Sequence, residues 1–123
     1  MNGEELAREA FCYLTTTGRV TGRPHTIEIW FGLEDQTLYM LAGGGTGADW
    51  VKNGLREPEV SVRIGEQHFR GRARLVDDPG EDARARRIVV EKYQPGYGED
   101  LSSWGRTALP VAVDLRTEAS DRA

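Results

Sequence analysis

The chain is poor in several residue types, and each shortage narrows what it can be. Its 123 residues include one cysteine, Cys12, and only two histidines. A single cysteine excludes an intramolecular disulfide framework, and its place in the apolar run of residues 10–14 is typical of a buried, unreactive thiol in a cytosolic protein. His68 has no partner at the spacing of metal ligands, so we expect no metal.

Long apolar runs and excess positive charge are also missing. No stretch approaches the roughly 18 apolar residues of a membrane-spanning helix, and residues 1–15 lack the basic start and apolar core of a secretory signal. The net charge of −4 and the pI near 5.2 argue against a general nucleic-acid or membrane-surface binder, because both depend on excess positive charge. We therefore expect a cytoplasmic protein without a nucleic-acid partner or a membrane span, in which any anion site is local.

Alternating apolar and polar residues predict about six strands, most of them joined by short turns. The second and third strands are close enough in sequence to form one hairpin, and the fourth and fifth form another, with Phe69, Ala73 and Leu75 pointing inward. Arg70, Arg72 and Arg74 then lie on the opposite, solvated face. The strands are expected at residues 11–17, 26–31, 37–42, 59–64, 67–76 and 109–115.

Three helices accompany these strands. Residues 4–9 can form a short leading helix, residues 49–56 a crossover helix that stops before Pro58, and residues 81–93 a late helix. We expect the polar stretch 98–106 to be a loop and the tail 116–123 to be frayed. The pattern predicts one α+β domain over residues 1–123, mainly β, and favours a small barrel with helices over a doubly wound fold.

The segment of residues 15–24, Thr-Thr-Thr-Gly-Arg-Val-Thr-Gly-Arg-Pro, is the most informative part of the chain. It connects two strand-like runs, and Gly18 and Gly22 can supply the positive φ angles that a tight connection needs. Arg19, Thr21 and Arg23 crowd hydrogen-bond donors into five residues, a composition suited to an anion. The segment is either a phosphate anchor or an ordinary solvated hairpin loop.

A series of motifs in order gives the chain a family resemblance. They are residues 15–24, Trp30-Phe31, Trp50-Val51-Lys52-Asn53, Pro58-Glu59-Val60, Lys92-Tyr93-Gln94-Pro95-Gly96-Tyr97, Ser103-Trp104 and Leu109-Pro110-Val111. Together they resemble the deazaflavin-dependent nitroreductase family, over roughly residues 12–115. The resemblance implies a split β-barrel related to the FMN-binding pyridoxamine-phosphate-oxidase-like proteins, usually a homodimer.

The same resemblance implies reduced coenzyme F420 as hydride donor and a quinone-like, nitroaromatic or other electron-poor molecule as acceptor. The cofactor then does the chemistry while the protein positions it. Two alternatives stay open. One is a split-barrel protein that binds F420 or FMN without turnover, and the other is an FMN-dependent oxidoreductase.

The resemblance also assigns cofactor-binding residues. They are Gly18, Arg19, Val20, Thr21, Arg23, Pro24, His25, Gly43, Gly44, Trp50 and Asn53. Val20 departs from the family, in which many members have lysine, and Arg23 can compensate for the lost charge from the next turn. The glycines that start at Gly43 stand where the family often has a serine and a lysine, and their amides can still cradle an anion or pack under a flat ring.

Further residues are assigned by position on the predicted elements. Trp50 and Asn53 lie three apart on one helical face, although Trp50 can equally be a core anchor. For the acceptor, the resemblance implies Tyr97 as the catalytic proton donor and Tyr93, Leu101 and Trp104 as the substrate pocket. Tyr93 also fits the apolar stripe of the late helix, which is the core alternative.

Glu28 is an unusual carboxylate in the middle of a strand. We expect it to face outward or toward a dimer partner and to pair with Arg19 or His25. The alternative is a contact with the polar edge of the deazaflavin or of the substrate.

Overall fold

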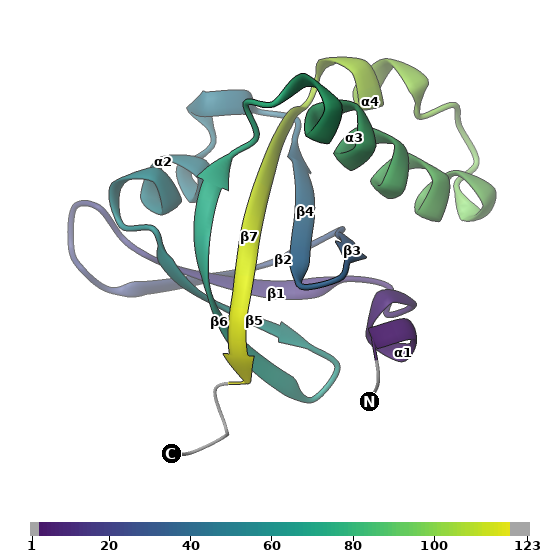
Figure 1. Cartoon of the computed structure of the whole chain (residues 1–123). Helices are drawn as coiled ribbons and strands as arrows, with labels where there is room; N and C mark the ends of the chain where they lie inside the picture. Colours follow the sequence, from purple (N-terminus) through teal and green to yellow (C-terminus); the bar gives the residue numbers. More distant parts are fainter. Residues whose placement is uncertain (1–2, 119–123) are drawn as a thin grey trace.

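The computed structural model describes residues 3–118, which form one curled antiparallel sheet with helices at its ends and on its outer face (Figure 1). The strand order in the sheet is β2-β1-β5-β6-β7-β4-β3. The strands are β1 (Cys12–Thr17), β2 (Pro24–Ile29), β3 (Gly32–Glu34), β4 (Thr37–Ala42), β5 (Glu59–Ile64), β6 (Gln67–Leu75) and β7 (Leu109–Glu118). The α-helices are α1 (Gly3–Ala7), α2 (Asp49–Arg56), α3 (Pro79–Tyr93) and α4 (Ser102–Thr107), and short 3-10 turns lie at Gly45–Gly47 and Gln94–Gly96.

The main core fills the concave side of the sheet. Alternate residues of β1 and β5 point into it, as the period of a strand requires, so that Leu14, Val62 and Ile64 are buried. Met40 and Val113 add to the same cluster from β4 and β7. Because both edges of this sheet curl toward each other, one apolar cluster connects strands from the two edges.

A second, smaller core lies under α3 on the outer face of the sheet. Tyr39 and Ala112 from β4 and β7 contact the buried Ala85 and Val89 of the helix. Asp78 caps α3, since its carboxylate accepts the N–H of Glu81 at 2.8 Å, as an N-cap side chain should. The position of α3 matters for function because its last residue, Tyr93, reaches the end of β2.

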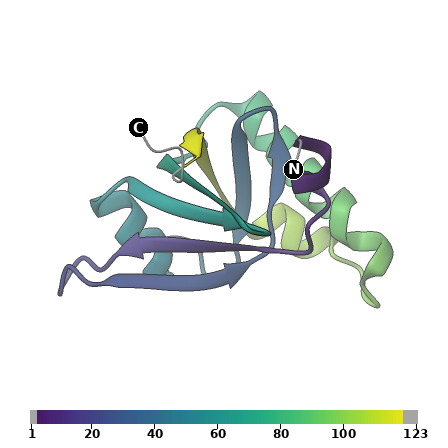
Figure 2. The ribbon, with the colours of Figure 1, turned by 90° about the horizontal axis from the view of Figure 1, so that it is seen from below.

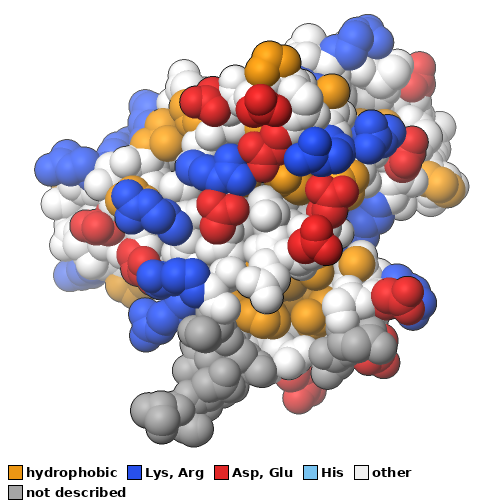
Figure 3. Space-filling view, viewed as in Figure 1, with side chains coloured by type: hydrophobic (Ala, Val, Ile, Leu, Met, Phe, Trp, Pro, Cys, Tyr) orange, Lys and Arg blue, Asp and Glu red, His pale blue; other side chains and the backbone are white. Residues whose placement is uncertain are grey.

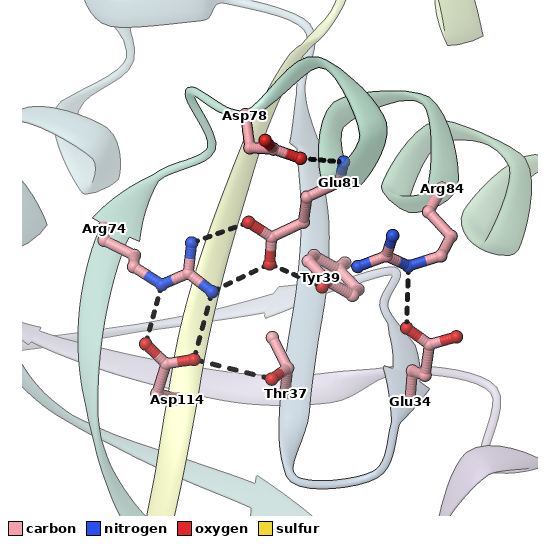
Figure 4. Close-up of polar contacts among 8 residues, drawn as sticks. All are labelled: Glu34, Thr37, Tyr39, Arg74, Asp78, Glu81, Arg84 and Asp114. Atoms are coloured by element: carbon pink, nitrogen blue, oxygen red, sulfur yellow. Dashed lines mark hydrogen bonds and ion pairs between the residues drawn. The ribbon is translucent and has the colours of Figure 1, made fainter.

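A group of polar side chains fixes α3 to the sheet (Figure 4). The Arg74 guanidinium donates two hydrogen bonds to Glu81, at 2.9 and 2.8 Å, and two to Asp114, at 2.7 and 3.2 Å. The Tyr39 hydroxyl donates to Glu81 at 2.6 Å. Hydrogen bonds from Arg74 and then from Tyr39 lower the pKa of Glu81 to about 2, so this carboxylate is ionised at neutral pH. Figure 3 shows the same face, on which basic and acidic side chains lie interspersed.

The sequence predicts much of this architecture. The mainly antiparallel α+β fold is confirmed, and α2 and β5 have the predicted bounds. The predicted pairing of residues 59–64 with 67–76 is confirmed in β5 and β6, and the strands on either side of residues 18–23 pair as β1 and β2.

The hairpin expected between residues 26–31 and 37–42 is wrong. β2 pairs only with β1 and forms one edge of the sheet, whereas β4 pairs with β7 and with the short β3. Within the short connection between these two expected strands, Gly32–Glu34 forms β3, so the local partner of β4 is β3. The chain between Ile29 and Gly32 therefore crosses from one edge of the curled sheet to the other.

Three other expectations need correction. Leu75, expected to point inward, is exposed, because it ends β6 at the rim of the sheet. The stretch 98–106, expected to be a loop, includes all of α4 (Ser102–Thr107) except its last residue, and this helix packs against α3. The tail expected to fray from residue 116 instead continues β7 to Glu118, where the strand pairs with Phe69 of β6, and the remaining residues 119–123 lie outside the described part.

Candidate active site

The glycine-bearing loop between β1 and β2 is closed by its own backbone. The Gly18 N–H donates to Arg23 O at 2.7 Å, and the Gly22 N–H donates to Gly18 O at 2.9 Å. Gly22 has a φ of 77°, in the left-handed region that glycine adopts at little cost. A Cβ at Gly18 would lie 2.7 Å from the His25 ring, so the first glycine allows the loop to pack against β2. β1, β2 and this loop extend together from the body of the molecule (Figure 2).

Helix α2 holds Arg19 in place. Asn53 Oδ1 accepts two hydrogen bonds from Arg19, one from the backbone N–H at 3.2 Å and one from Nη1 at 2.7 Å. Nη2 of the same guanidinium donates to Asp49 at 3.1 Å. The arginine is thus oriented by two residues that lie four apart and share one face of α2.

Asn53 uses both ends of its carboxamide inside the protein. Its side chain is buried, with 4% of the residue exposed, and Nδ2 donates to Thr16 Oγ1 at 3.3 Å. Burial of a polar side chain is tolerated when its hydrogen bonds are made. The geometry therefore gives Asn53 a positioning role between β1, the loop and α2.

A cleft of about 480 Å³ opens between the loop, β2 and α2. It brings together seven of the eleven residues that the sequence assigned to a cofactor: Gly18, Arg19, Val20, Thr21, His25, Trp50 and Asn53. The other lining residues are Thr16, Thr26, Ile27 and Asp49. A cleft of this size, with one positioned cation and an indole, suits a ligand that has both an anionic part and a flat ring.

The remaining assigned residues lie outside the lining of this cleft. Arg23 and Pro24 are exposed at the far end of the loop and the start of β2. Val20 does line the cleft, but it is 87% exposed. Gly43 and Gly44 lie between β4 and the 3-10 turn, where a Cβ at Gly43 would be 3.5 Å from the Trp104 ring. This glycine run therefore borders α4 and a second group of aromatic side chains.

That second group centres on Trp30, just after β2. The Trp30 ring stacks on Tyr93, with centroids 4.2 Å apart, and meets Tyr97 and Trp104 edge to face at 5.5 and 5.8 Å. The three residues around Trp30 are ones that the sequence assigned to the acceptor. Trp30 itself was not predicted as a site residue. The sequence shows only that an aromatic pair, Trp30-Phe31, ends a strand, and the importance of this pair depends on where α3 and α4 pack.

The two tyrosines of this group have different surroundings. The Tyr93 hydroxyl accepts the Phe31 N–H at 3.0 Å and donates to Ala10 O at 2.8 Å, and burial raises the pKa of Tyr93 to about 12. Its hydroxyl is committed to the backbone, in agreement with the core alternative. Tyr97 is 45% exposed, and within residues 3–118 its hydroxyl makes no hydrogen bond. Leu101 is buried beside Trp104.

Glu28 does not pair with Arg19 or His25, and that expectation is wrong. Its carboxylate instead accepts the Tyr13 hydroxyl at 3.2 Å from the neighbouring strand, because residues 13 and 28 are directly opposite in the register of β1 and β2. The Arg63 guanidinium lies 4.2 Å above the same Tyr13 ring.

Two titratable groups lie near the aromatic cluster, Cys12, which is buried, and Lys92, which is half-buried. Burial raises the pKa of Cys12 to about 12, so the thiol stays protonated and is a poor nucleophile. Burial lowers the pKa of Lys92 to about 8, and its ammonium donates to Phe31 O at 3.1 Å and lies 3.6 Å from the Phe31 ring centroid. Among residues 3–118 there is no group of three or more metal-ligating side chains, and no helix long and apolar enough to cross a membrane.

Comparisons with known proteins agree with this architecture. Residues 1–116 match the model of the family described as F420H(2)-dependent quinone reductase. An F420-H2 dependent reductase is 24% identical, with a TM-score of 0.68 over 85% of this chain and 93% of its own. An F420 reductase is 16% identical, with a TM-score of 0.67 over 97% and 98%. A protein described as a domain-swapped dimer is 21% identical, with a TM-score of 0.70 over 85% and 79%. At these identities the three structures establish the split-barrel fold.

Proposed function

Because this chain belongs to the F420H2-dependent quinone reductase family, we propose that the cleft between the loop, β2 and α2 holds coenzyme F420 and that the aromatic cluster receives the electron acceptor. Family membership makes the protein an F420-dependent reductase. The observation that carries the proposal is the cleft itself, which gathers seven assigned residues from three separate segments of the chain.

The residues of the cleft fit such a cofactor. Arg19 is held with its guanidinium at the cleft, where it can donate charged hydrogen bonds to a phosphate. Thr21 adds a hydroxyl, His25 adds a ring nitrogen and Trp50 offers a flat apolar surface to a ring system. Asp49 is the one acidic side chain of the lining, and a phosphate that binds Arg19 competes with it.

The cleft and the aromatic cluster are connected along β2. Ile27 lines the cleft, and Trp30 lies three residues farther on, a distance of about 10 Å at the rise of a strand. A long cofactor with its phosphate at the loop can therefore reach toward Trp30 with its ring. Gly43, next to Trp104, leaves room for such a ring at the base of α4.

When bound, reduced F420 supplies a hydride, which carries the two electrons that the acceptor needs. A quinone that takes up a hydride becomes a hydroquinone anion, and one proton completes the hydroquinone. We assign the donation of that proton to Tyr97, whose ring contacts Trp30 in the cluster and whose exposure lets water restore the proton afterwards. Nitroaromatic and other electron-poor acceptors make the same demand.

A non-catalytic F420-binding or FMN-binding protein is the second candidate, and two features of the cleft favour it. Val20 brings no charge to the loop, and Asp49 partly neutralises Arg19. Both features reduce the attraction for the phosphate and oligoglutamate tail of F420. FMN has a single phosphate, so it needs fewer positive charges in this loop, and it is the alternative cofactor.

We also propose a homodimer. β2 forms an edge of the sheet whose outer side carries no further strand among residues 3–118, and an open edge is a natural place for a second chain. The resemblance in fold to a domain-swapped dimer supports this assembly. Light scattering should give twice the chain mass of 13.7 kDa, and a monomer mass would contradict the proposal.

Turnover separates the reductase from the binding protein. Purified protein should oxidise reduced F420 in the presence of menadione, followed by the return of the oxidised cofactor's absorbance. Tyr97→Phe should lower kcat by about 100-fold while cofactor binding stays unchanged. Binding of F420 without menadione-dependent oxidation would favour the second candidate. Protein-dependent oxidation by menadione of reduced FMN, but not of reduced F420, would favour FMN as the cofactor.

A further inference from the structure

Trp30 occupies the place where aromatic side chains from three other segments meet. Tyr93 ends α3, Tyr97 follows the 3-10 turn and Trp104 belongs to α4, and all three contact the Trp30 ring. The planes of Trp30 and Tyr93 differ by only 2°, whereas Tyr97 and Trp104 stand at 89° and 88° to Trp30. One face of the indole is thus covered by Tyr93.

The same indole lines three separate hollows. One of about 260 Å³ lies toward Phe11 and Glu28, one of about 520 Å³ toward Lys92 and one of about 650 Å³ toward Leu101. Trp30 is the one residue common to all three linings. Trp104 is also shared by the first and third hollows and Tyr97 by the second and third, whereas the first and second share Trp30 alone. Trp30 therefore stands as the partition between the first two hollows, spaces of the order of size that binds a small ring compound.

This partition is fixed by the backbone of the next residue. The Phe31 N–H donates to the Tyr93 hydroxyl at 3.0 Å, and Phe31 O accepts from Lys92 at 3.1 Å. Phe31 itself is fully buried in the main core. Because both polar groups of Phe31 are held by α3, the position of Trp30 is fixed on both the backbone and the ring side.

We infer that Trp30 is the residue that limits the size of the acceptor, by keeping these hollows separate so that a compact ring is accepted and a ring with a bulky chain is refused. The inference rests on the proposed function, because it takes the aromatic cluster as the acceptor site. Replacing the indole with a methyl group would join the first two hollows, which share only Trp30, and give a substituent on the ring a place to lie. A flexible lid would not select in this way, since it could move aside.

Two acceptors and two variants test the role of Trp30. The acceptors are menadione and a menadione analogue that carries a hexyl chain on its quinone ring. Calorimetry on the cofactor-free protein gives both dissociation constants for wild type, Trp30→Ala and Trp30→Phe. The ratio of the analogue's constant to that of menadione should fall by about tenfold or more in Trp30→Ala, since single methylene differences in apolar pockets are worth roughly 10- to 200-fold.

Trp30→Phe is the matched variant, because it keeps a ring on Tyr93 and removes only part of the partition. Its ratio should lie between those of wild type and Trp30→Ala, and it decides the question if Trp30→Ala does not fold. An unchanged ratio in the folded variants would overturn the inference. The same ratio of kcat/KM values with reduced F420 should follow the binding data. Wild-type protein that fails to turn over menadione would contradict the proposed function, while the binding ratio would still judge the role of Trp30.

Discussion

At the scale of single residues, the site depends on how side chains are held as much as on which ones are present. Arg19 was expected to meet phosphate, and in the structure its guanidinium is already oriented by Asp49 and Asn53. Asn53 was expected to contact the ligand, and in the structure both ends of its carboxamide make hydrogen bonds within the protein. We therefore interpret Asn53 as a positioning residue for the loop.

Asn53→Ala tests that interpretation. The change removes three hydrogen bonds from a buried group and leaves Thr16 and the Arg19 backbone without their partner, so the free energy of unfolding should fall by about 1–3 kcal/mol. Asp49→Ala is the matched control on the same face of α2. It breaks one exposed ion pair and should cost at most about 1 kcal/mol. Denaturant unfolding without cofactor measures the free energy of unfolding of both variants. An equally small decrease in the two variants would contradict the positioning role of Asn53 and favour a ligand contact.

At the scale of elements, the sequence predicted single helices and strands better than it predicted which strands pair in the sheet. The helix at 49–56 and the strand at 59–64 were predictable because Pro58 separates them and their apolar residues follow clear periods. The partner strands of residues 37–42 were not predictable from the sequence. The local partner, β3, has only three residues, and the pairing of the strands depends on the curl of the whole sheet. Trp30 was missed for the same reason: its importance comes from α3 and α4, which the alternation of β2 cannot reveal.

The attachment of α3 to the sheet should depend on pH through Glu81. The pKa of this carboxylate is lowered from 4.5 to about 2 in the folded protein, so its stabilisation is present above pH 4.5 and is lost as the pH falls toward 2. Glu81→Gln should lower the free energy of unfolding by about 1–3 kcal/mol at neutral pH, and the difference from wild type should shrink through that acidic range.

Glu57→Gln provides the control for Glu81, since Glu57 is an exposed glutamate at the end of α2. Its unfolding free energy should follow that of wild type at each pH. A difference between wild type and Glu81→Gln that stays constant from pH 7 to pH 2 would contradict the role given to the network around Arg74.

At the scale of the whole molecule, the curled sheet brings distant segments of the chain to one strand. β2 borders the loop and α2 at one end and the ends of α3 and α4 at the other. An elongated cofactor is the kind of ligand that uses both ends. The order of the motifs in the sequence indicated the family and its cofactor. The distance between the cleft and the aromatic cluster, and the pairing of Arg19 with Asp49 that reduces the positive charge of the cleft, depend on the folded arrangement.

Cofactor titration tests the central claim most directly, because Trp50 lines the proposed cofactor cleft. Wild-type protein and Arg19→Ala are titrated with F420 and, in parallel, with FMN, while tryptophan fluorescence is recorded. We predict saturable quenching by F420 in wild type, and binding weaker by about 1–3 kcal/mol in Arg19→Ala, the value of a charged hydrogen bond to phosphate. Absence of F420 binding at micromolar concentration, or the same affinity in wild type and Arg19→Ala, would contradict the account.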